Sequence, residues 1–355
     1  MNLKILSKEE WLYWWRQLPA CCREVYWHPA YYDTASRWEK GHAECIYIDK
    51  GDAWMIYPYL RHPIVGYQLP GAAFYYDIQT AYGYGGALFI GEWDDKDKIT
   101  AYTVIADYFR ETNAVAELVR CHTEWIDPAV MVKAGYSTIK VRTNVETELI
   151  GKLPEEILSS WEKEVQRNIR KAKEADLDHM LIHGTGRVND FAVLYNMAAE
   201  RLHMTPYYQF NEAYFRSLMA VDNKQVGQVL CSMSSSHSGL IASHVVFLGE
   251  KLAFLHLAAV DSAFRSVHAD AFMMWADVYY ASMMGCERIC WGGGMSINPD
   301  DSLFKFKAKF GQRYVPVYIG CRIIDKKIYE QLCAEWNRRN AQKLHTTNKF
   351  LRYRY

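Results

Sequence analysis

The sequence predicts an α/β (α+β) protein of two consecutive domains, each with a mixed, mostly antiparallel sheet flanked by helices. Three observations predict this fold class. The length of 355 residues suits two domains of about 150 to 200 residues each. Half of the residues are hydrophobic and 15% are aromatic, which is ample material for packed cores. Short β-prone runs alternate with helical patterns along both halves of the chain.

The first half begins with a helix. Residues 7–10 read Ser-Lys-Glu-Glu, the spacing of a capping box, and apolar residues follow at helical intervals, so we expect the helix to begin near Lys8. Two β-prone runs, 43–49 and 53–60, surround a turn that contains Gly51 and predict a hairpin. The pattern then predicts a helix over 96–111 and strands over 114–119 and 137–141.

A strongly charged helix over 154–176 separates the two halves. Pro154 and the acidic residues Glu155 and Glu156 open it, an arrangement that a helix N-terminus favours. We therefore place the domains at 1–150 and 151–355. In the second domain we expect strands at 180–183, 225–232, 239–247, 251–257 and 288–291, and helices at 189–201, 211–219 and 268–284. The last of these helices is apolar nearly all round, which predicts that it is packed against a sheet.

Charge and hydropathy exclude several classes of protein. Lys plus Arg and Asp plus Glu both total 41, so no global field attracts nucleic acid, and we expect no DNA partner. The most apolar stretch, 240–259, is interrupted by charged and histidine residues, so we expect no membrane span. The chain begins without the apolar run of a signal peptide, and its nine cysteines contain no Cys-x-x-Cys pair. We expect a cytoplasmic protein with reduced thiols and no metal.

Three motifs contain most of the candidate functional residues. Residues 77–88 read Asp-Ile-Gln-Thr-Ala-Tyr-Gly-Tyr-Gly-Gly-Ala-Leu, and residues 167–172 read Arg-Asn-Ile-Arg-Lys-Ala. Trp-Gly-Gly-Gly at 291–294 is followed by Leu-Phe-Lys-Phe-Lys-Ala-Lys-Phe-Gly at 303–311. In this order the motifs resemble the signatures of the FemAB family, with Ala87 in place of the usual proline. The element order of the second half also resembles a GNAT acetyltransferase domain, and a less regular version precedes it.

The resemblance implies two tandem GNAT-like domains, the N-terminal one degenerate, in an acyltransferase. Known FemAB members move an amino acid from aminoacyl-tRNA to the peptide of a peptidoglycan precursor, and others resemble acyl-CoA-dependent transferases. The resemblance thus implies an aminoacyltransferase of cell-wall biogenesis that acts on an amine of a small molecule or cell-envelope precursor. Aminoacyl-tRNA or acyl-CoA would be the co-substrate, with no tightly bound cofactor. Two alternatives stay open: an acyl-CoA-dependent N-acyltransferase acting on a polysaccharide or lipid-linked amine, and a non-catalytic precursor-binding module.

The candidate catalytic residues are Lys305, Lys307 and Asp77. A lysine beside three glycines can contact the donor phosphate or the oxyanion that forms at the acyl carbonyl, because glycine lets a ligand approach the backbone closely. Solvated surface lysines are the alternative for such a run. Asp77 or a substrate carboxylate would help to remove the proton of the acceptor amine. We expect no covalent enzyme intermediate, because no nucleophile motif is present.

Donor contacts are expected around the loop 264–270 and the glycine run. His268 and Asp270 stand where acetyl-CoA enzymes carry glycines, and a carboxylate at Asp270 would repel pyrophosphate. Aminoacyl-tRNA is therefore the leading donor and acyl-CoA the runner-up. The candidate donor-binding residues are Arg265, His268, Gly292, Gly293, Gly294 and Phe304.

Acceptor contacts are expected from the tyrosine-glycine turn, from a basic helix face and from a connection between two helices. Backbone amides and tyrosine hydroxyls suit a polar acceptor, and clustered arginines suit a diphosphate. A ligand-free aromatic turn and a solvated basic face are the alternatives. The candidate acceptor-binding residues are Arg61, Tyr82, Gly83, Tyr84, Gly85, Gly86, Arg167, Arg170, Tyr207 and Tyr208. The basic tail from Lys326 onward could meet tRNA phosphates or an anionic membrane surface, or could simply be solvated.

Overall fold

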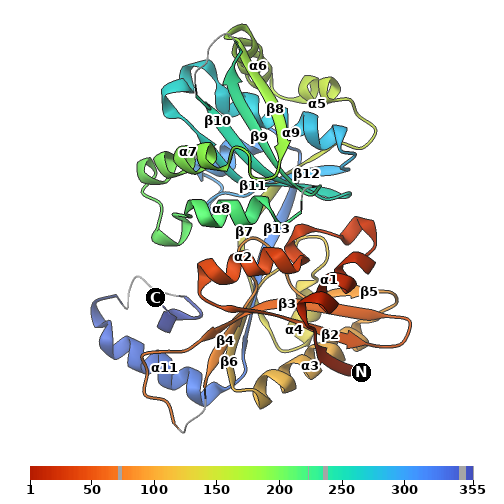
Figure 1. Ribbon diagram of the computed structural model, residues 1–355. Coiled ribbons are helices and arrows are strands. Elements are labelled where there is room, and N and C mark those ends of the chain that lie inside the picture. The colour runs from red at the N-terminus through yellow and green to blue at the C-terminus, as the bar shows by residue number, and fades with distance from the viewer. Residues whose placement is uncertain (71–73, 223, 235–238, 344–348, 355) are drawn as a thin grey trace. The chain divides into compact units, whose positions relative to one another are not determined.

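The computed structural model describes residues 1–70, 74–222, 224–234, 239–343 and 349–354 (Figure 1). Contacts between residues divide the chain into two compact units. The first unit comprises 1–14, 35–141 and 317–355, and the second comprises 15–34 and 142–316. The expected domains at 1–150 and 151–355 stay a prediction. The two compact units defined by contacts are not continuous in sequence. The C-terminal segment belongs with the first unit, and an early segment belongs with the second.

The first unit is built on one mixed sheet. Its strand order is β1-β2-β3-β4-β6-β13, with β5 paired to β3, and the pairs are antiparallel except for the parallel pair β4–β6. Its strands are β1 (Asn2–Ile5), β2 (His42–Asp49), β3 (Trp54–Pro63), β4 (Tyr76–Gln79), β5 (Leu88–Ile90), β6 (Ala114–Arg120) and the larger part of β13 (Arg313–Ile323). Its helices are α3 (Asp95–Glu111), α4 (Pro128–Lys133) and α11 (Lys326–Arg339), with short 3-10 turns η5 (Ala341–Lys343) and η6 (Arg352–Arg354).

Four elements contribute residues to both units. They are α1 (Lys8–Gln17), α2 (Pro29–Glu39), β7 (Ser137–Glu148) and β13. The capping box predicted at the start of α1 is present, because the Glu10 carboxylate accepts the Ser7 N–H at 2.9 Å and the Ser7 hydroxyl accepts the Glu10 N–H at 3.2 Å. The first helix therefore begins where the sequence predicts.

The second unit is built on the strand order β7-β12-β11-β10-β9-β8, in which only β11 and β12 run parallel. Its strands are β8 (Leu177–His183), β9 (Val226–Met233), β10 (Ala242–Leu248), β11 (Leu252–Val260) and β12 (Arg288–Gly292). Its helices are α5 (Pro154–Ser160), α6 (Lys163–Glu174), α7 (Val188–Arg201), α8 (Glu212–Met219), α9 (Ala269–Met283) and α10 (Ser302–Ala308), with the 3-10 turns η1 (Ala20–Cys22), η2 (Val25–Trp27), η3 (Pro206–Tyr208) and η4 (Ser262–Val267).

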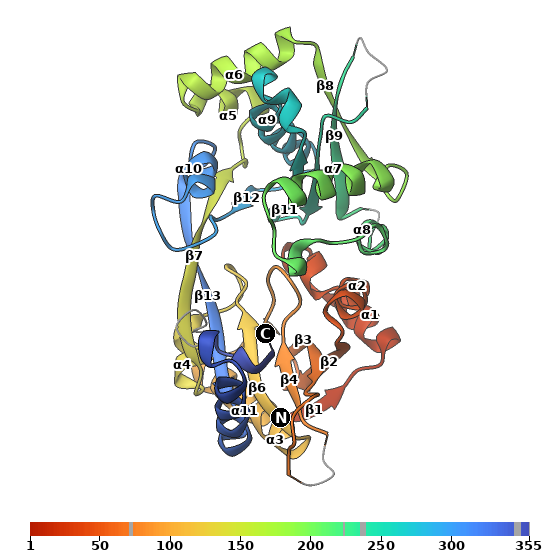
Figure 2. The same cartoon turned by 90° about the vertical axis from the view of Figure 1, so that its left-hand side faces the viewer.

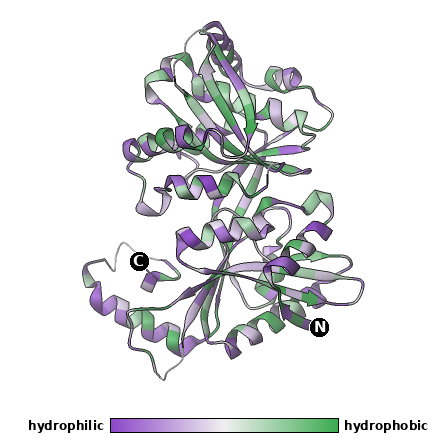
Figure 3. Ribbon diagram, viewed as in Figure 1, coloured by the Kyte–Doolittle hydropathy of each residue, from purple (hydrophilic) through white to green (hydrophobic). Residues whose placement is uncertain are grey.

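Helix α9 lies at the centre of the hydrophobic core of the second unit. Its apolar residues pack with α5, α6 and one face of the strands, whereas α7 covers the other face (Figures 1 and 2). Hydrophobic residues accordingly follow the strands, while α6 is strongly hydrophilic on its outer side (Figure 3). The prediction of a long apolar helix packed against a sheet is confirmed, and so is the fold class, because the strand pairing in each unit is mixed and mostly antiparallel and helices flank the strands.

Two sequence-based element predictions need correction. The charged helix expected over 154–176 is two helices, because Trp161 between α5 and α6 leaves the helical conformation and enters the core, where its ring lies 5.2 Å from that of Phe310. The strand expected over 137–141 continues to Glu148 as β7. Both errors arise because long-range packing determines the last residues of an element.

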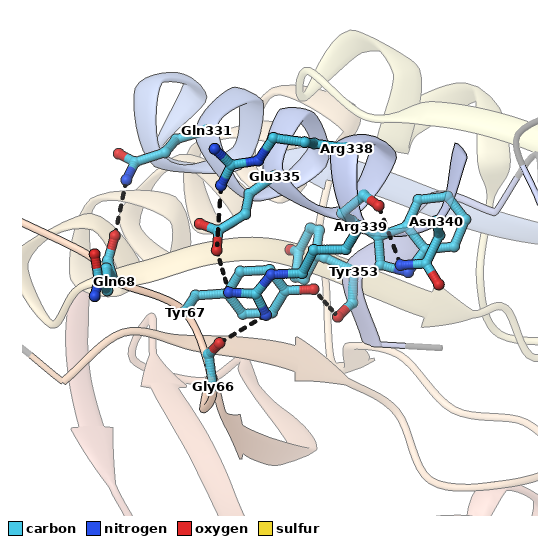
Figure 4. Close-up of polar contacts among 10 residues, drawn as sticks. Gly66, Tyr67, Gln68, Gln331, Glu335, Arg338, Arg339, Asn340 and Tyr353 are labelled. Carbon is cyan, nitrogen blue, oxygen red and sulfur yellow. Dashed lines mark hydrogen bonds and ion pairs between the residues drawn. The ribbon is translucent and has the colours of Figure 1, made fainter. Parts of the chain in front are cut away.

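The basic tail is folded onto the first unit (Figure 4). Arg339 donates to the Gly66 carbonyl at 2.9 Å, stacks over the Tyr67 ring at 4.8 Å and pairs with Glu335. The Tyr67 hydroxyl donates to the Tyr353 carbonyl at 2.8 Å. Arg339, Tyr67 and Tyr353 therefore make structural contacts, while Arg338 lies on the same helix with 78% of its side chain exposed, 3.8 Å from Glu335.

Among the residues that the structure describes, none of the helices is both long enough and apolar enough to span a bilayer. All nine cysteines are free thiols, and most of them are buried.

Candidate active site

The strands β11 and β12 of the second unit separate part-way along their length. They pair in parallel over three positions, from Leu252 with Arg288 to Phe254 with Cys290. Beyond this point β11 continues for six residues in pairing with β10 alone. Beyond Phe254 and Cys290, β11 and β12 are not paired with each other.

Each of the two separating strands has a β-bulge at this point. Against β10, the register of β11 shifts so that His256 is an extra residue between Leu255 and Leu257. Against β7, the register of β12 shifts so that Trp291 is extra between Cys290 and Gly292. A bulge leaves a residue outside the ladder and re-aims its neighbours, and bulges are frequent beside active sites.

The glycine run after β12 is packed too tightly for side chains. An added Cβ at Gly293 would lie 2.4 Å from the Thr143 carbonyl oxygen, and one at Gly294 would lie 2.5 Å from Asp301 Oδ1. Asp301 also caps α10, since its carboxylate accepts the N–H groups of Leu303 and Phe304, each at 3.0 Å. The same carboxylate accepts the Met295 N–H at 2.8 Å. The glycine run and α10 therefore form one rigid loop-helix unit.

The two candidate lysines of α10 have different environments. Lys307 Nζ donates to the Gly293 carbonyl at 3.0 Å and lies 3.3 Å from where a Cβ of Gly292 would be. Burial lowers the pKa of Lys307 to about 8, and Arg142 adds to this effect. Lys305 instead pairs with Asp300 at 2.7 Å, with 59% of its side chain exposed. The phenylalanines Phe304, Phe306 and Phe310 pack against the core, as the alternation predicts.

Polar residues of β7 beside this loop were missed by the sequence analysis. Asn144 and Glu146 are fully buried, on either side of Val145 in the strand. The Glu146 carboxylate accepts from Arg288 at 2.8 Å and lies 3.5 Å from Arg313 Nε. Asn144 donates to the Cys290 sulfur at 3.4 Å. No alternation of polar and apolar residues marks this row, since residues 142–148 read Arg-Thr-Asn-Val-Glu-Thr-Glu, and the strand was expected to end at Val141.

The candidate donor loop lies between β11 and α9. His268 adopts φ +56°, the left-handed conformation that glycine adopts readily, in line with its position where acetyl-CoA enzymes carry a glycine. Asp270 lies in the first turn of α9, where its carboxylate accepts the Ala271 N–H at 2.8 Å. Arg265 is exposed on η4. A negative charge thus occupies the helix end that would otherwise attract a phosphate.

The tyrosine-glycine turn of the first unit continues the pairing of β4 with β6. The Thr80 hydroxyl accepts the Arg120 N–H at 2.8 Å, and the Gly85 N–H donates to the Arg120 carbonyl at 2.8 Å. Gly86 has φ +118°, and an added Cβ there would lie 2.6 Å from Ile126. Gly85, Gly86 and Tyr84 are buried, whereas Tyr82 and Gly83 are half-buried. These contacts continue the parallel pair β4–β6 beyond the ends of the two strands.

Asp77 and Arg61 lie on the strands of the first unit. Asp77 is fully buried; it accepts the Tyr353 hydroxyl at 2.7 Å and lies 2.9 Å from Arg354 Nε. Burial raises the pKa of Asp77 to about 6, against the opposing effect of Arg354. This position does not support the predicted role as catalytic base, because the C-terminal segment covers the carboxylate. Arg61 stacks on the Tyr76 ring at 4.0 Å and lies 3.5 Å from Glu44.

The other candidate acceptor residues lie on the second unit. Arg167, Arg170 and Lys171 are exposed on α6, and Arg170 lies 3.8 Å from Glu174. Tyr207 and Tyr208 are half-buried in η3, between α7 and α8 as predicted.

A hollow of about 290 Å³ lies at the end of β7. Its lining contains none of the candidate residues. It is lined by Thr147, Glu148, Gly151, Lys152, Glu156, Ile157, Ser160 and Gln312.

Comparison with known proteins gives a likeness in structure alone. No family model matches the sequence, and no curated protein matches it. The crystal structure of FemX is similar with a TM-score of 0.68 at 13% identity, over 93% of this chain and 99% of that one. The C-terminal domain of a putative lysylphosphatidylglycerol synthetase from Agrobacterium fabrum is similar with a TM-score of 0.54 at 11% identity, over 89% of this chain and 93% of that one.

A tandem GNAT protein from the clavulanic acid biosynthesis pathway is also similar. Its TM-score is 0.50 at 11% identity, over 91% of this chain and 99% of that one. At such identities the likeness concerns the fold. The chain therefore has the fold of FemX and of a tandem GNAT protein, and the resemblance to the FemAB family that the three sequence motifs indicate is confirmed at the level of the fold.

Proposed function

We propose that this protein is an acyltransferase whose reaction centre lies at the separated ends of β11 and β12 in the second unit. The observation that carries the proposal is the position of Lys307. Its ammonium group is held by the Gly293 carbonyl at the end of β12, beside the point where the two strands part. A positive charge fixed in a desolvated site stabilises a developing oxyanion far better than a mobile charge in water.

In the proposed reaction, an acceptor amine attacks the carbonyl carbon of an activated acyl ester. A C–N bond forms and the carbonyl oxygen becomes negative, where Lys307 and a backbone N–H of the separated strands stabilise it. The bond to the leaving oxygen then breaks. The proton lost by the amine is matched by the proton gained by the leaving group, so the step needs no oxidant and no covalent enzyme intermediate.

We infer that the donor is an aminoacyl-tRNA and that the acceptor is an amine of a cell-envelope precursor. The likeness to FemX supports this choice, as does the carboxylate of Asp270 at the first turn of α9, which disfavours a coenzyme A pyrophosphate. Arg167 and Arg170 are exposed on α6 and available for an anionic acceptor. Transfer from an acyl-CoA stays the second candidate, since the tandem GNAT likeness favours it.

Transfer assays with radiolabelled donors test the proposal. Aminoacyl-tRNA and a series of acyl-CoA esters would each be combined with a nucleotide-linked muropeptide and with amine-bearing polysaccharide. Lys307→Ala should lower kcat by about 10²-fold, the loss typical of one oxyanion donor. Lys305→Ala should lower it by less than about threefold, because that residue is exposed and paired with Asp300.

Two outcomes would contradict the proposal. Equal losses of kcat in Lys305→Ala and Lys307→Ala would show that Lys307 has no special role at the reaction centre. Tight binding of a precursor without transfer from any donor would favour the non-catalytic binding module instead.

A further inference from the structure

The bulge residue of β11, His256, is held by an aromatic cage. Its ring stacks on Phe247 at 4.1 Å between centroids, and its Nδ1 lies 3.3 Å from the Tyr26 hydroxyl. The side chain is 9% exposed. Burial lowers the pKa of His256 to about 3, so the imidazole is neutral at physiological pH. A neutral ring with one fixed hydrogen-bond partner has one preferred orientation.

The residue that orients His256 comes from a distant part of the sequence. Tyr26 lies on η2, in the segment 15–34 that packs with the second unit. Its ring also contacts Phe254 at 5.0 Å and Phe247 at 5.2 Å. The segment is further anchored where Gln225 donates to the Arg23 carbonyl at 2.5 Å. Tyr26 therefore contacts the paired residues Phe247 on β10 and Phe254 on β11, and the bulge residue His256 itself.

The contact between Tyr26 and His256 lies next to the point where β11 and β12 stop pairing. Phe254 is the last residue of β11 that pairs with β12, and His256 follows it by two positions. A bulge residue lacks a regular place in the ladder, so its side-chain contacts take a larger share in fixing its backbone. Groups that must meet a transition state work best when neighbouring packing and hydrogen bonds hold them in place.

We propose that Tyr26 is a positioning residue for the reaction centre: its hydroxyl donates to His256 Nδ1, fixes the β11 bulge and so orients the backbone groups that face the acyl carbonyl. This inference rests on the proposed function. It also assigns a role in the reaction to the segment 15–34, which belongs to the second unit. A hydroxyl is expected to act as the donor here, because the phenolic O–H is a better donor than acceptor toward a ring nitrogen. His256 would then carry its proton on Nε2.

The test compares Tyr26→Phe with Tyr280→Phe. Both changes remove a tyrosine hydroxyl from a histidine Nδ1, since the Tyr280 hydroxyl lies 2.9 Å from His179 Nδ1 in the same unit, on β8 and away from the bulge. Tyr26→Phe keeps the ring and its aromatic contacts, so the fold should survive. Two readouts on the whole protein need no substrate: the ¹⁵N shifts of the His256 ring and the exchange rate of its backbone amide.

We expect Tyr26→Phe to raise amide exchange at His256 and Leu257 by about tenfold and to change the ring ¹⁵N pattern, with both unchanged in Tyr280→Phe. With the donor and acceptor found by the transfer assay, kcat should fall about tenfold while KM for the donor stays within about twofold. A purely structural role would instead lower stability without this division between kcat and KM.

The inference is overturned if Tyr26→Phe leaves exchange and ring shifts at His256 unchanged, or if Tyr280→Phe lowers kcat to the same extent. His256→Gln gives a second measure, because the glutamine amide can keep a hydrogen bond to the Tyr26 hydroxyl. If the losses in kcat of Tyr26→Phe and His256→Gln simply add in the double variant, the two residues act independently and the inference is also overturned. Absence of transfer by the unchanged protein with every donor would instead count against the proposed function, while the exchange and ¹⁵N measurements would still test the bulge contact.

Discussion

At the scale of single residues, environment decides which of two equivalent lysines can act. Lys305 and Lys307 lie on the same short helix, two positions apart. Lys305 is exposed and paired with an aspartate, whereas Lys307 is half-buried against the Gly293 carbonyl with a pKa lowered to about 8. The lower pKa follows from desolvation, which disfavours the charged form. Below about pH 8 the ammonium form still predominates, so the residue can act as a cation at neutral pH.

This pKa predicts the alkaline side of the activity profile. If the Lys307 ammonium group stabilises the oxyanion, kcat should fall as the pH rises through about 8, because the group loses its proton there. Lys307→Arg should retain its charge and shift this fall to higher pH. The measurement is kcat under saturating substrates from pH 6 to 10. A wild-type profile that is flat through pH 8 would contradict the assignment.

The glycine of the same loop supplies a second prediction at this scale. In Gly293→Ala, the new methyl group would meet the Thr143 carbonyl at 2.4 Å, so the loop must shift. We expect a loss of about 1–3 kcal/mol in the free energy of unfolding, together with a loss of transfer activity as Lys307 moves. Urea denaturation measures the first and the transfer assay the second. Gly186→Ala is the control, because nothing lies within 4 Å of its added Cβ; an equal loss there would refute the packing argument.

At the scale of elements, residues 349–354 form a strap that is bonded to strands and a helix of the first unit. Arg354 reaches the buried Asp77 and also donates to the His62 carbonyl at 2.7 Å, while Tyr329 donates to the Phe350 carbonyl at 2.6 Å. Asp77 begins the motif that continues into the tyrosine-glycine turn. The strap therefore stabilises the strand that leads into this turn.

Substitution of Arg354 should lower the free energy of unfolding. Arg354→Ala leaves the Asp77 carboxylate buried without its cation, which we expect to lower the free energy of unfolding by about 3–5 kcal/mol at pH 8. The loss should be smaller at pH 5, because Asp77, whose pKa is already about 6, then takes up a proton. Urea unfolding at both pH values measures it. Arg338→Ala, at an exposed position on α11, should change stability by less than about 0.5 kcal/mol; losses of equal size at pH 5 and pH 8 in Arg354→Ala would contradict the charge argument.

At the scale of the whole molecule, each unit contains one parallel strand pair, and the two pairs differ in how far they are continued. In the second unit the parallel pair β11–β12 parts after three positions. In the first unit the corresponding parallel pair β4–β6 is continued by Thr80 and by the bridge from Gly85 to Cys121. The motif that was expected to contact the acceptor thus closes the first unit internally. The degenerate character of the N-terminal unit is consistent with this closure.

Buried histidines in both units predict sensitivity to acid. Burial lowers the pKa of His28 to about 4 and that of His62 and His256 to about 3, from an ordinary value of 6.5. Below pH 6.5 the unfolded chain binds protons that the folded chain does not, so stability falls as the pH falls. Each histidine should contribute a loss of about 2 kcal/mol between pH 7.5 and pH 5.

One histidine can be isolated by substitution. The difference in unfolding free energy between the unchanged protein and His62→Gln should shrink by about 2 kcal/mol from pH 7.5 to pH 5, since the variant lacks the titrating group. Asp77, with its raised pKa, acts in the opposite direction in both proteins and cancels in the difference. His42→Gln, at an exposed position, is the control. A difference that is constant with pH for His62→Gln would contradict the buried, neutral state.

The sequence by itself determined the fold class, the order of most elements, the Lys-Phe helix beside the glycine run and the place of His268, because hydrophobic periods, capping residues and glycines act locally. Only the tertiary structure decided that Lys307 is half-buried whereas Lys305 is exposed, that Asp77 is covered by Arg354, and that β7 has polar buried residues at Asn144 and Glu146. It also decided that Tyr26 meets His256, a contact between residues 230 positions apart. Burial and pairing between distant strands set these features, and no local pattern encodes which partners will meet.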